Sequence, residues 1–311
     1  MPSPSTALRA LALVLLLAAL GWLVWARPDD LAAIPGHLAR LPAKAWLGVF
    51  ALTLLSYALR FLRWHLLLTH LGHRIPLGRQ ALIYLAGFGL AMTPGKLGET
   101  VRSAYLVPLG VPLGHSLAAF FTERLADLLI VSLLASLALA PLLAHPVWFG
   151  VVWAGLLALL ALLRSRLLPG LARRLGRGTL AHTAGDGAHA LHHLLRGRML
   201  CLSLLLGGLA WAGQGLGLWL LLATGGAAPP PWPTVGSYAL SLLAGALSFV
   251  PGGLGVTEGT LLWLLQQQGM GITQAATAAL IGRGVPLWLG MLAGLVALAV
   301  LGSSRRLGTR P

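Results

Sequence analysis

Long apolar runs, each long enough to cross a membrane, constrain the fold of this chain more than any other feature. About 20 helical residues cross a hydrocarbon core roughly 30 Å thick. Six runs meet this length: residues 8–26, 45–68, 116–140, 147–163, 199–223 and 273–301. Only 9% of the residues are charged and 57% are hydrophobic, which excludes an ordinary soluble domain. We therefore expect an all-α, polytopic membrane helical bundle, with residues 1–311 forming a single integral membrane domain.

The positions of the basic residues predict how the bundle is oriented. The net charge is +15, and arginines follow the second, fourth and sixth runs, above all in the basic loop 164–198. The connections at 141–146 and 224–233 contain no Lys or Arg. Because basic loops stay on the cytoplasmic side, we expect both termini in the cytoplasm and interpret the positive charge as a topology signal, not as a nucleic-acid surface. The bulky end of the first run predicts an uncleaved signal anchor.

Two further apolar segments are too short to span and are interrupted by proline and glycine. Residues 81–93 stop at Pro94-Gly95, and a short run follows to 107; residues 235–250 stop at Pro251-Gly252-Gly253, and a short run follows to 268. Each segment is interpreted as a broken-helix hairpin, 81–107 and 235–268, and the two open to opposite sides. Re-entrant hairpins and full crossings satisfy the charge rule equally, so both possibilities stay open.

The two breaks are copies of one motif. Thr93-Pro94-Gly95-Lys96-Leu97-Gly98-Glu99 recurs, two residues longer, as Val250-Pro251-Gly252-Gly253-Leu254-Gly255-Val256-Thr257-Glu258. An arginine follows each glutamate 25 positions later, at Arg124 and Arg283. Copies in opposite orientation predict an inverted repeat, with halves at 45–140 and 147–301. Since backbone groups freed in a broken helix must be buried in protein or line a polar cavity, we expect both breaks to meet inside the bundle.

Ionisable residues in hydrophobic segments are candidates for a binding site, because they are costly in a membrane unless they are paired or functional. The predicted substrate-binding residues are Lys96, Glu99, Arg102, Glu123, Arg124, Asp127, Glu258 and Arg283. The basic members, with the free N–H groups of a helix that starts near Lys96, suit a phosphate-bearing head group. The acids could neutralise the empty site, bind a proton or meet a cationic part of the substrate. Helical spacing places Glu123, Arg124 and Asp127 on one inward-facing arc, and a purely structural pair of Arg124 with Asp127 is the alternative.

Other polar groups are assigned to structure. Arg60 and Arg63, beside Trp64, are interpreted as side chains that reach the head-group layer. The histidines of 182–193 lack the partners of a metal site, and an interfacial basic helix is the favoured interpretation. No nucleotide-binding loop, zinc-protease pair or nucleophile elbow occurs in the sequence, so we expect no enzymatic activity, no metal and no cofactor.

The paired motifs resemble those of the flippase-like transmembrane family, the membrane region of lysylphosphatidylglycerol synthase and its stand-alone bacterial and archaeal relatives. The resemblance covers about residues 45–301 and is carried by 93–99, Glu123-Arg124-x-x-Asp127, 251–258 and Arg283. It implies a multi-pass protein of the cytoplasmic (inner) membrane that moves a polar lipid between leaflets. The synthase's soluble aminoacyl-transfer domain has no counterpart here, so lysyl transfer is not expected.

These observations together predict a lipid translocase for an anionic or phosphate-bearing polar lipid. The expected partners are that lipid and the bilayer, with no nucleic acid. The alternative is a non-catalytic membrane partner that presents lipid to a separately encoded glycosyl or aminoacyl transferase; a purely structural membrane protein is the third reading. The resemblance leaves the choice among phospholipid, glycolipid, hopanoid and polyprenyl-phosphate open.

Overall fold

The computed structural model describes residues 32–90, 101–139, 146–165, 179–226, 229–248 and 250–307, and these form an all-helical bundle without strands. Within these ranges, three helices are long and apolar enough to cross a membrane: α4 (Ala43–His70), α11 (Gly197–Thr224) and Ile272–Ser303 of α14 (Ile272–Leu307). Two more follow predicted runs: α7 (Leu113–Leu139) and α8 (Pro146–Arg164). The polytopic helical bundle is therefore confirmed, and the count of six spans stays a prediction because run 8–26 lies outside the described residues.

The two longest paired helices begin and end where the sequence punctuates them. Pro42 caps the start of α4 and separates it from the short helix α3 (Ile34–Arg40). Gly72 follows the end of α4 with φ 87°, and Gly226 follows the end of α11 with φ 91°. Since a left-handed residue after a helix terminates it, glycine at these positions sets where each helix stops.

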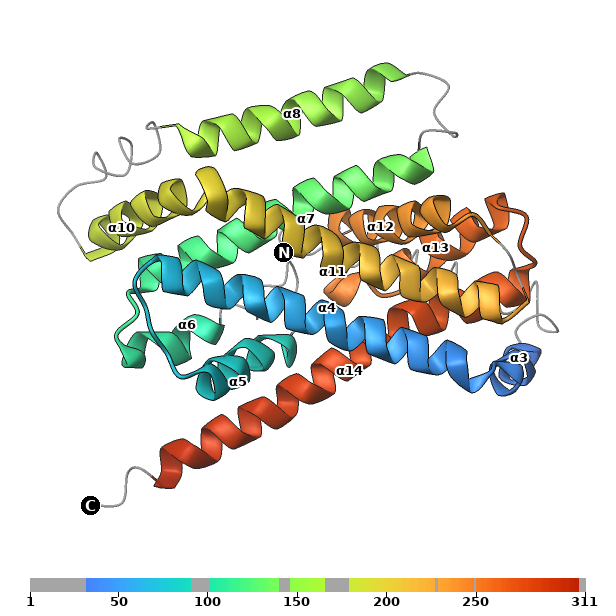
Figure 1. The fold of residues 1–311 in the computed structure, drawn as a ribbon, viewed down its shortest axis with the longest axis horizontal. Coiled ribbons are helices and arrows are strands. Elements are labelled where there is room, and N and C mark those ends of the chain that lie inside the picture. The colour runs from blue at the N-terminus through green and yellow to red at the C-terminus, as the bar shows by residue number, and fades with distance from the viewer. Residues whose placement is uncertain are drawn as a thin grey trace, which may run out of the picture.

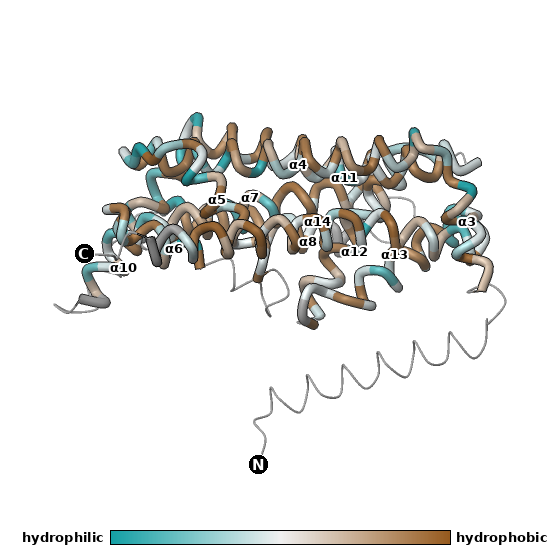
Figure 2. The backbone as a smooth tube through the Cα atoms, turned by 90° about the horizontal axis from the view of Figure 1, so that it is seen from below, coloured by the Kyte–Doolittle hydropathy of each residue, from teal (hydrophilic) through white to brown (hydrophobic). Residues whose placement is uncertain are grey.

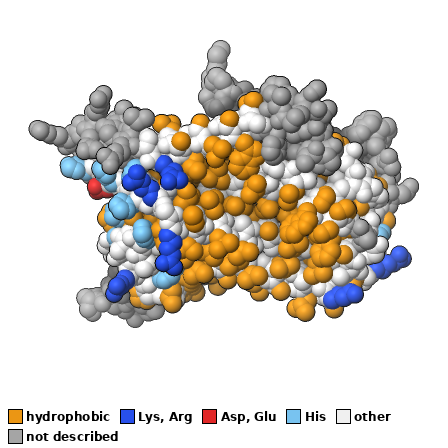
Figure 3. All heavy atoms as spheres, turned by 45° about the horizontal axis from the view of Figure 1, so that its top comes forward, with side chains coloured by type: hydrophobic (Ala, Val, Ile, Leu, Met, Phe, Trp, Pro, Cys, Tyr) orange, Lys and Arg blue, Asp and Glu red, His pale blue; other side chains and the backbone are white. Residues whose placement is uncertain are grey.

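The helices form two layers. In Figure 2, α4 and α11 run side by side as one layer above the others, and the helices are brown in their middle parts and paler or teal towards their ends. Figure 3 shows apolar side chains spread over a wide central band, with most of the visible Lys, Arg and His side chains gathered at one end of the molecule. An apolar belt with polar ends is the surface that a bilayer requires.

Two broken-helix hairpins lie towards opposite ends of the bundle (Figure 1). The first consists of α5 (Leu77–Phe88), α6 (Val101–Leu106) and the short η2 (Val107–Leu109). The second consists of α12 (Pro231–Leu247), η4 (Pro251–Gly253) and α13 (Val256–Gln267). In each, the two arms pack against each other, as the sequence predicts. The break of the first hairpin, with Pro94, Gly95 and Gly98, lies outside the described residues.

The packing of the helices repeats between the two halves. If α3 to α7 are exchanged with α10 to α14 in the same order, contacts map onto contacts: α5 on α14 becomes α12 on α7, and α4 on α14 becomes α11 on α7. The central pair α4 and α11 maps onto itself. An interval of 159 residues separates Phe88 from Leu247, where α5 and α12 end, and Leu113 from Ile272, where α7 and α14 begin. This pattern is that of an inverted repeat whose halves are interlocked.

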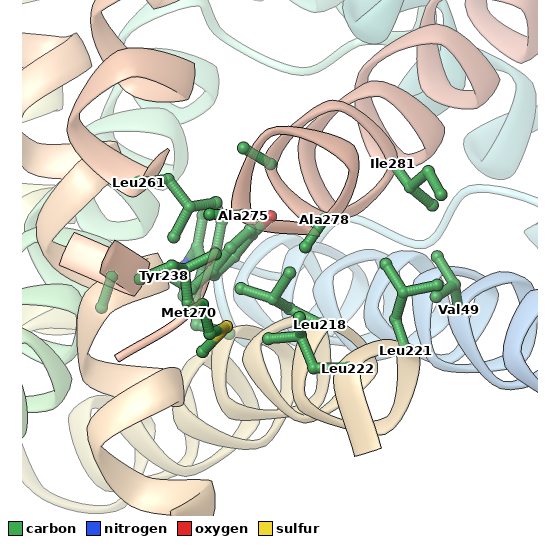
Figure 4. Close-up of a cluster of buried hydrophobic side chains, with 14 of the residues drawn as sticks. Val49, Leu218, Leu221, Leu222, Tyr238, Leu261, Met270, Ala275, Ala278 and Ile281 are labelled. Carbon is green, nitrogen blue, oxygen red and sulfur yellow. The ribbon is translucent and has the colours of Figure 1, made fainter. Parts of the chain in front are cut away.

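Each half has an apolar core that borrows residues from the other. The second-half core, drawn in Figure 4, packs Val49 of α4 against Leu218 and Leu221 of α11 and Ile281 of α14. The first-half core, around Trp64 and Tyr84, includes Ala297 of α14.

A helix, α10 (Thr179–Leu194), occupies part of the predicted basic loop 164–198 and packs on the start of α7. Gly114 and Gly187 permit this close approach, because a Cβ at Gly114 would lie 2.7 Å from the Gly187 backbone nitrogen.

Candidate functional site

A buried ion pair joins the first hairpin to α7. Arg102, on α6, donates from Nη1 to Oε2 of Glu123 at 2.9 Å, and both side chains are 1% exposed or less. The guanidinium passes beside Gly87 of α5, where a Cβ would lie 2.5 Å from Arg102 Nε. Glycine at position 87 therefore opens the path by which Arg102 reaches the carboxylate.

The second carboxylate of α7 collects partners from three helices. Asp127 Oδ1 lies 2.8 Å from Arg63 Nη1 of α4 and accepts a hydrogen bond of 2.9 Å from Trp211 Nε1 of α11. Its Oδ2 lies 3.1 Å from Arg124 Nη2, one turn earlier on α7. Arg63 Nη2 also lies 3.5 Å from Glu123 Oε1, so Arg63 bridges both acids. The predicted pair of Arg124 with Asp127 is confirmed as one edge of a larger network.

Aromatic rings enclose the guanidinium groups on their other faces. The Arg102 guanidinium carbon lies 4.0 Å from the ring centre of Tyr84 and 5.0 Å from that of Trp64. The Arg60 guanidinium lies 4.9 Å from the Trp211 ring and 5.3 Å from that of Phe88. Cation–π contacts are strongest where water is excluded, so these rings stabilise positive charge inside the bundle.

The interpretation of Arg60 and Arg63 as head-group contacts is wrong. Arg60, Arg63 and Trp64 are all buried, with exposed fractions of 6%, 1% and 0%. The reason is visible on α4 itself, where Thr53 and Ser56 are also buried polar residues. Positions 53, 56, 60 and 63 follow helical spacing on one face. That polar stripe faces α7 and α11 instead of lipid, and it was the signal in the sequence that could have identified Arg63 as part of the site.

In the second half, the predicted residues hold the elbow of the hairpin. Glu258 accepts a hydrogen bond of 2.6 Å from the backbone N–H of Gly255, which caps the start of α13. Arg283 Nη2 donates to the carbonyl of Gly252 at 2.8 Å, and its Nε lies 3.9 Å from Glu258 Oε1. Gly252, Gly253 and Gly255 adopt φ of 65°, 66° and 77°, a conformation that glycine reaches without strain. Elbow groups that would be unsatisfied in lipid are thus partly satisfied by side chains.

Tyr57 connects the two groups of charges. Its hydroxyl donates to the carbonyl of Pro286 on α14, three residues after Arg283, and its ring lies 5.1 Å from that of Phe88. Arg60 and Arg283 both lie within electrostatic range of the Tyr57 hydroxyl. The first-half cluster and the second-half elbow therefore face each other across one aromatic side chain.

The predicted binding residues thus fall into three groups. Arg102, Glu123, Arg124 and Asp127 converge in one cluster, and Glu258 and Arg283 converge at the elbow with Pro251 nearby. Lys96 and Glu99 lie outside the described residues, as does the first break, so the predicted meeting of the two breaks stays a prediction. Within the described residues, no three His, Cys, Asp or Glu side chains are grouped closely enough to hold a metal ion.

The family described as "Lysylphosphatidylglycerol synthase TM region" matches residues 9–294. The chain belongs to this family. The match extends over nearly the whole chain, including both hairpins and every residue of the first-half cluster. No curated protein matches the chain. Membership of the lysylphosphatidylglycerol synthase TM family connects this membrane protein with a function in membrane lipid chemistry or handling.

Proposed function

We propose that this protein is a lipid translocase that moves a phosphate-bearing, anionic lipid between the leaflets of the membrane. The observation that carries the proposal is the buried cluster on α4, α6 and α7. In the described part of the chain, four arginines, Arg60, Arg63, Arg102 and Arg124, surround two carboxylates, Glu123 and Asp127. The cluster thus has an excess of two positive charges among those residues.

Buried positive charge in excess favours an anionic ligand. Removing a charge from water is costly unless it is paired, so an anion that enters this environment replaces solvation that the arginines have lost. Guanidinium groups bind phosphate oxygens in a forked geometry, and arginine suits phosphate better than lysine where the geometry must be fixed. In this proposal, the two acids hold the arginines in place between substrates, and the head group exchanges contacts with them during passage.

The inverted repeat supplies the mechanical part of the proposal. Transporters of this construction expose a central site to each side in turn as one half moves against the other. The hydrogen bond of Tyr57 with Pro286 lies where such a movement would be felt by both halves. Because the sequence has no nucleotide-binding loop, the translocation we propose is downhill or coupled to ions. A proton on Glu99, Asp127 or Glu258 is the coupling step that this set of acids offers.

Reconstitution into liposomes tests the proposal directly. Wild-type protein should accelerate the movement of fluorescent phosphatidylglycerol between leaflets, followed by chemical quenching of the outer leaflet. Arg124→Ala should lower the rate at least tenfold. Lys44→Ala is the matched control, since it also removes one positive charge but at an exposed position at the start of α4. Failure of the wild-type protein to accelerate any anionic lipid would overturn the proposal.

A second function is favoured by the family itself, whose description is that of a region of a synthase. In this alternative, the membrane bundle presents lipid to a separately encoded transferase. Co-purification of a transferase, together with an unchanged product yield when Arg124 is replaced, would favour presentation over translocation.

A further inference from the structure

An apolar groove opens beside the buried cluster, between α7, α8 and α10. Its volume is about 240 Å³, and five of its six lining residues are apolar. The lining residues are Phe121, Arg124, Leu125, Leu128, Leu163 and Leu191. Arg124 is thus the single charged side chain in the wall of a groove that otherwise resembles the surface of an acyl-chain site.

Arg124 differs from the other paired arginines of the cluster in its exposure. Its side chain is 20% exposed, whereas those of Arg63 and Arg102 are each 1% exposed. One face of Arg124 pairs with Asp127, at 3.1 Å, and its guanidinium carbon lies 5.6 Å from the Phe120 ring. The exposed remainder borders the groove. Arg124 is therefore the point at which the positive charge of the cluster becomes accessible from the apolar side.

The depth of Arg124 indicates what the groove holds. Arg124 follows the first residue of α7 by 11 positions, which is about 16 Å along the helix, or half of a hydrocarbon core about 30 Å thick. The phosphates of ordinary bilayer lipids lie in the head-group layer. A lipid whose phosphate meets Arg124 has therefore left that layer and lies part of the way across the membrane.

We infer that this groove is the lateral binding site of a diacyl phospholipid with an anionic phosphodiester head group. One acyl chain lies against Phe121, Leu128 and Leu163, and the phosphate contacts Arg124 at mid-membrane depth. Charge complementarity identifies the occupant: the excess of positive charge among the described cluster residues attracts a net anion and disfavours a head group that carries its own cation. The inference rests on the proposed function for the kind of cargo and adds the route by which that cargo reaches the cluster.

Lipid binding to the purified full-length protein tests the inference without a transport assay. The probes are dioleoyl phosphatidylglycerol and dioleoyl phosphatidylcholine, and the readouts are native mass spectrometry and the lipid-dependent shift in melting temperature. Leu128→Trp fills the groove and should weaken phosphatidylglycerol binding at least tenfold. Leu133→Trp is the matched control on the same helix, because Leu133 is 52% exposed and does not line the groove; it should bind as wild type. Arg124→Gln should remove the preference for phosphatidylglycerol over phosphatidylcholine.

A second variant keeps the test decisive if Leu128→Trp does not fold. Leu163→Trp fills the groove from α8 and should weaken binding in the same way. Wild-type binding of phosphatidylglycerol by a folded Leu128→Trp or Leu163→Trp protein would overturn the groove, and so would an unchanged lipid preference in Arg124→Gln.

The two proposals fail in different ways. Transport by wild type and by Leu128→Trp at equal rates would overturn the groove and keep the translocase. Groove-dependent binding with no transport of any anionic lipid would keep the groove and overturn the translocase.

Discussion

The two halves of the molecule share a plan of packing but not a chemistry. In the first half, arginines from α4 and α6 converge on the two acids of α7. In the second half, the equivalent helices place one arginine and one glutamate on the backbone of the elbow. The interval of 159 residues that aligns α7 with α14 places Gly282 opposite Glu123 and Pro286 opposite Asp127.

This difference separates two roles that an inverted repeat can give to its copies. The packing needed for two interlocked hairpins depends on helix length and small residues, and both halves retain it. The buried charges are an addition to that plan in one half only. A symmetric scaffold therefore needs no symmetric site, and the second hairpin is explained as a braced elbow that faces a charged first half.

The strongest way to break the comparison is to remove Glu123. Glu123→Ala leaves Arg102 without its 2.9 Å partner and Arg63 with one acid instead of two. Breaking a buried pair on one side costs about 3–5 kcal/mol, so the yield and thermal stability of the folded protein should collapse. Chemical unfolding in detergent gives the free energy of unfolding. The double variant Arg102→Met/Glu123→Met should recover part of the loss, and a double variant as unstable as Glu123→Ala would contradict the assignment.

Arg283 should matter less, because it contacts a carbonyl and one acid instead of bridging two buried acids. Arg283→Gln loses the charged hydrogen bond to the Gly252 carbonyl, and such bonds contribute about 1.5–3 kcal/mol. We expect a loss of stability in that range, measured by the same unfolding experiment. A loss equal to that of Glu123→Ala would show that the second half carries a charge site of the same kind.

The elbow itself can be tested with alanine. Gly253→Ala places a Cβ at φ 66°, 2.8 Å from Thr257 Oγ1, so we expect a loss of at least 1–2 kcal/mol. Gly259→Ala is the control, because it lies within α13 and its Cβ would meet nothing within 4 Å. That change should stabilise the protein by about 0.5–1 kcal/mol. Equal effects of the two substitutions would argue against a braced elbow.

The smallest effect concerns pH at the mouth of the first hairpin. His73 lies in the loop after α4, with Nε2 2.8 Å from Nδ1 of His115, and burial, followed by the nearby His115, lowers the pKa of His73 below its ordinary value of 6.5. The folded state therefore binds fewer protons than the unfolded state, and stability should fall as pH drops through about 6.5. The melting temperature measured between pH 7.5 and 5.5 should decline, and His73→Asn should flatten that decline. The loop between α11 and α12 has no titratable side chain, so a matching pH effect from the second half is not expected.

Much of the fold follows from the sequence, because run length and Pro-Gly interruptions are local signals. The ends of α4 and α11 lie within two residues of the predicted runs, and both hairpins are present. The site was less accessible. Arg102, Glu123 and Asp127 could be recognised as costly charges, but their partners come from distant helices. Trp211 donates to Asp127 across 84 residues, and nothing in its local sequence distinguishes it from the aromatic residues that face lipid.

The interlocking of the halves has a consequence for how the protein is made. The first hairpin packs through α5 on α14, which is the last of the described helices to leave the ribosome. Its apolar face and the core around Tyr84 therefore remain incomplete until nearly two hundred further residues have been inserted. During synthesis, the half that carries the buried charges depends on the insertion machinery or on surrounding lipids for cover, and loss of α14 would destabilise the opposite end of the molecule.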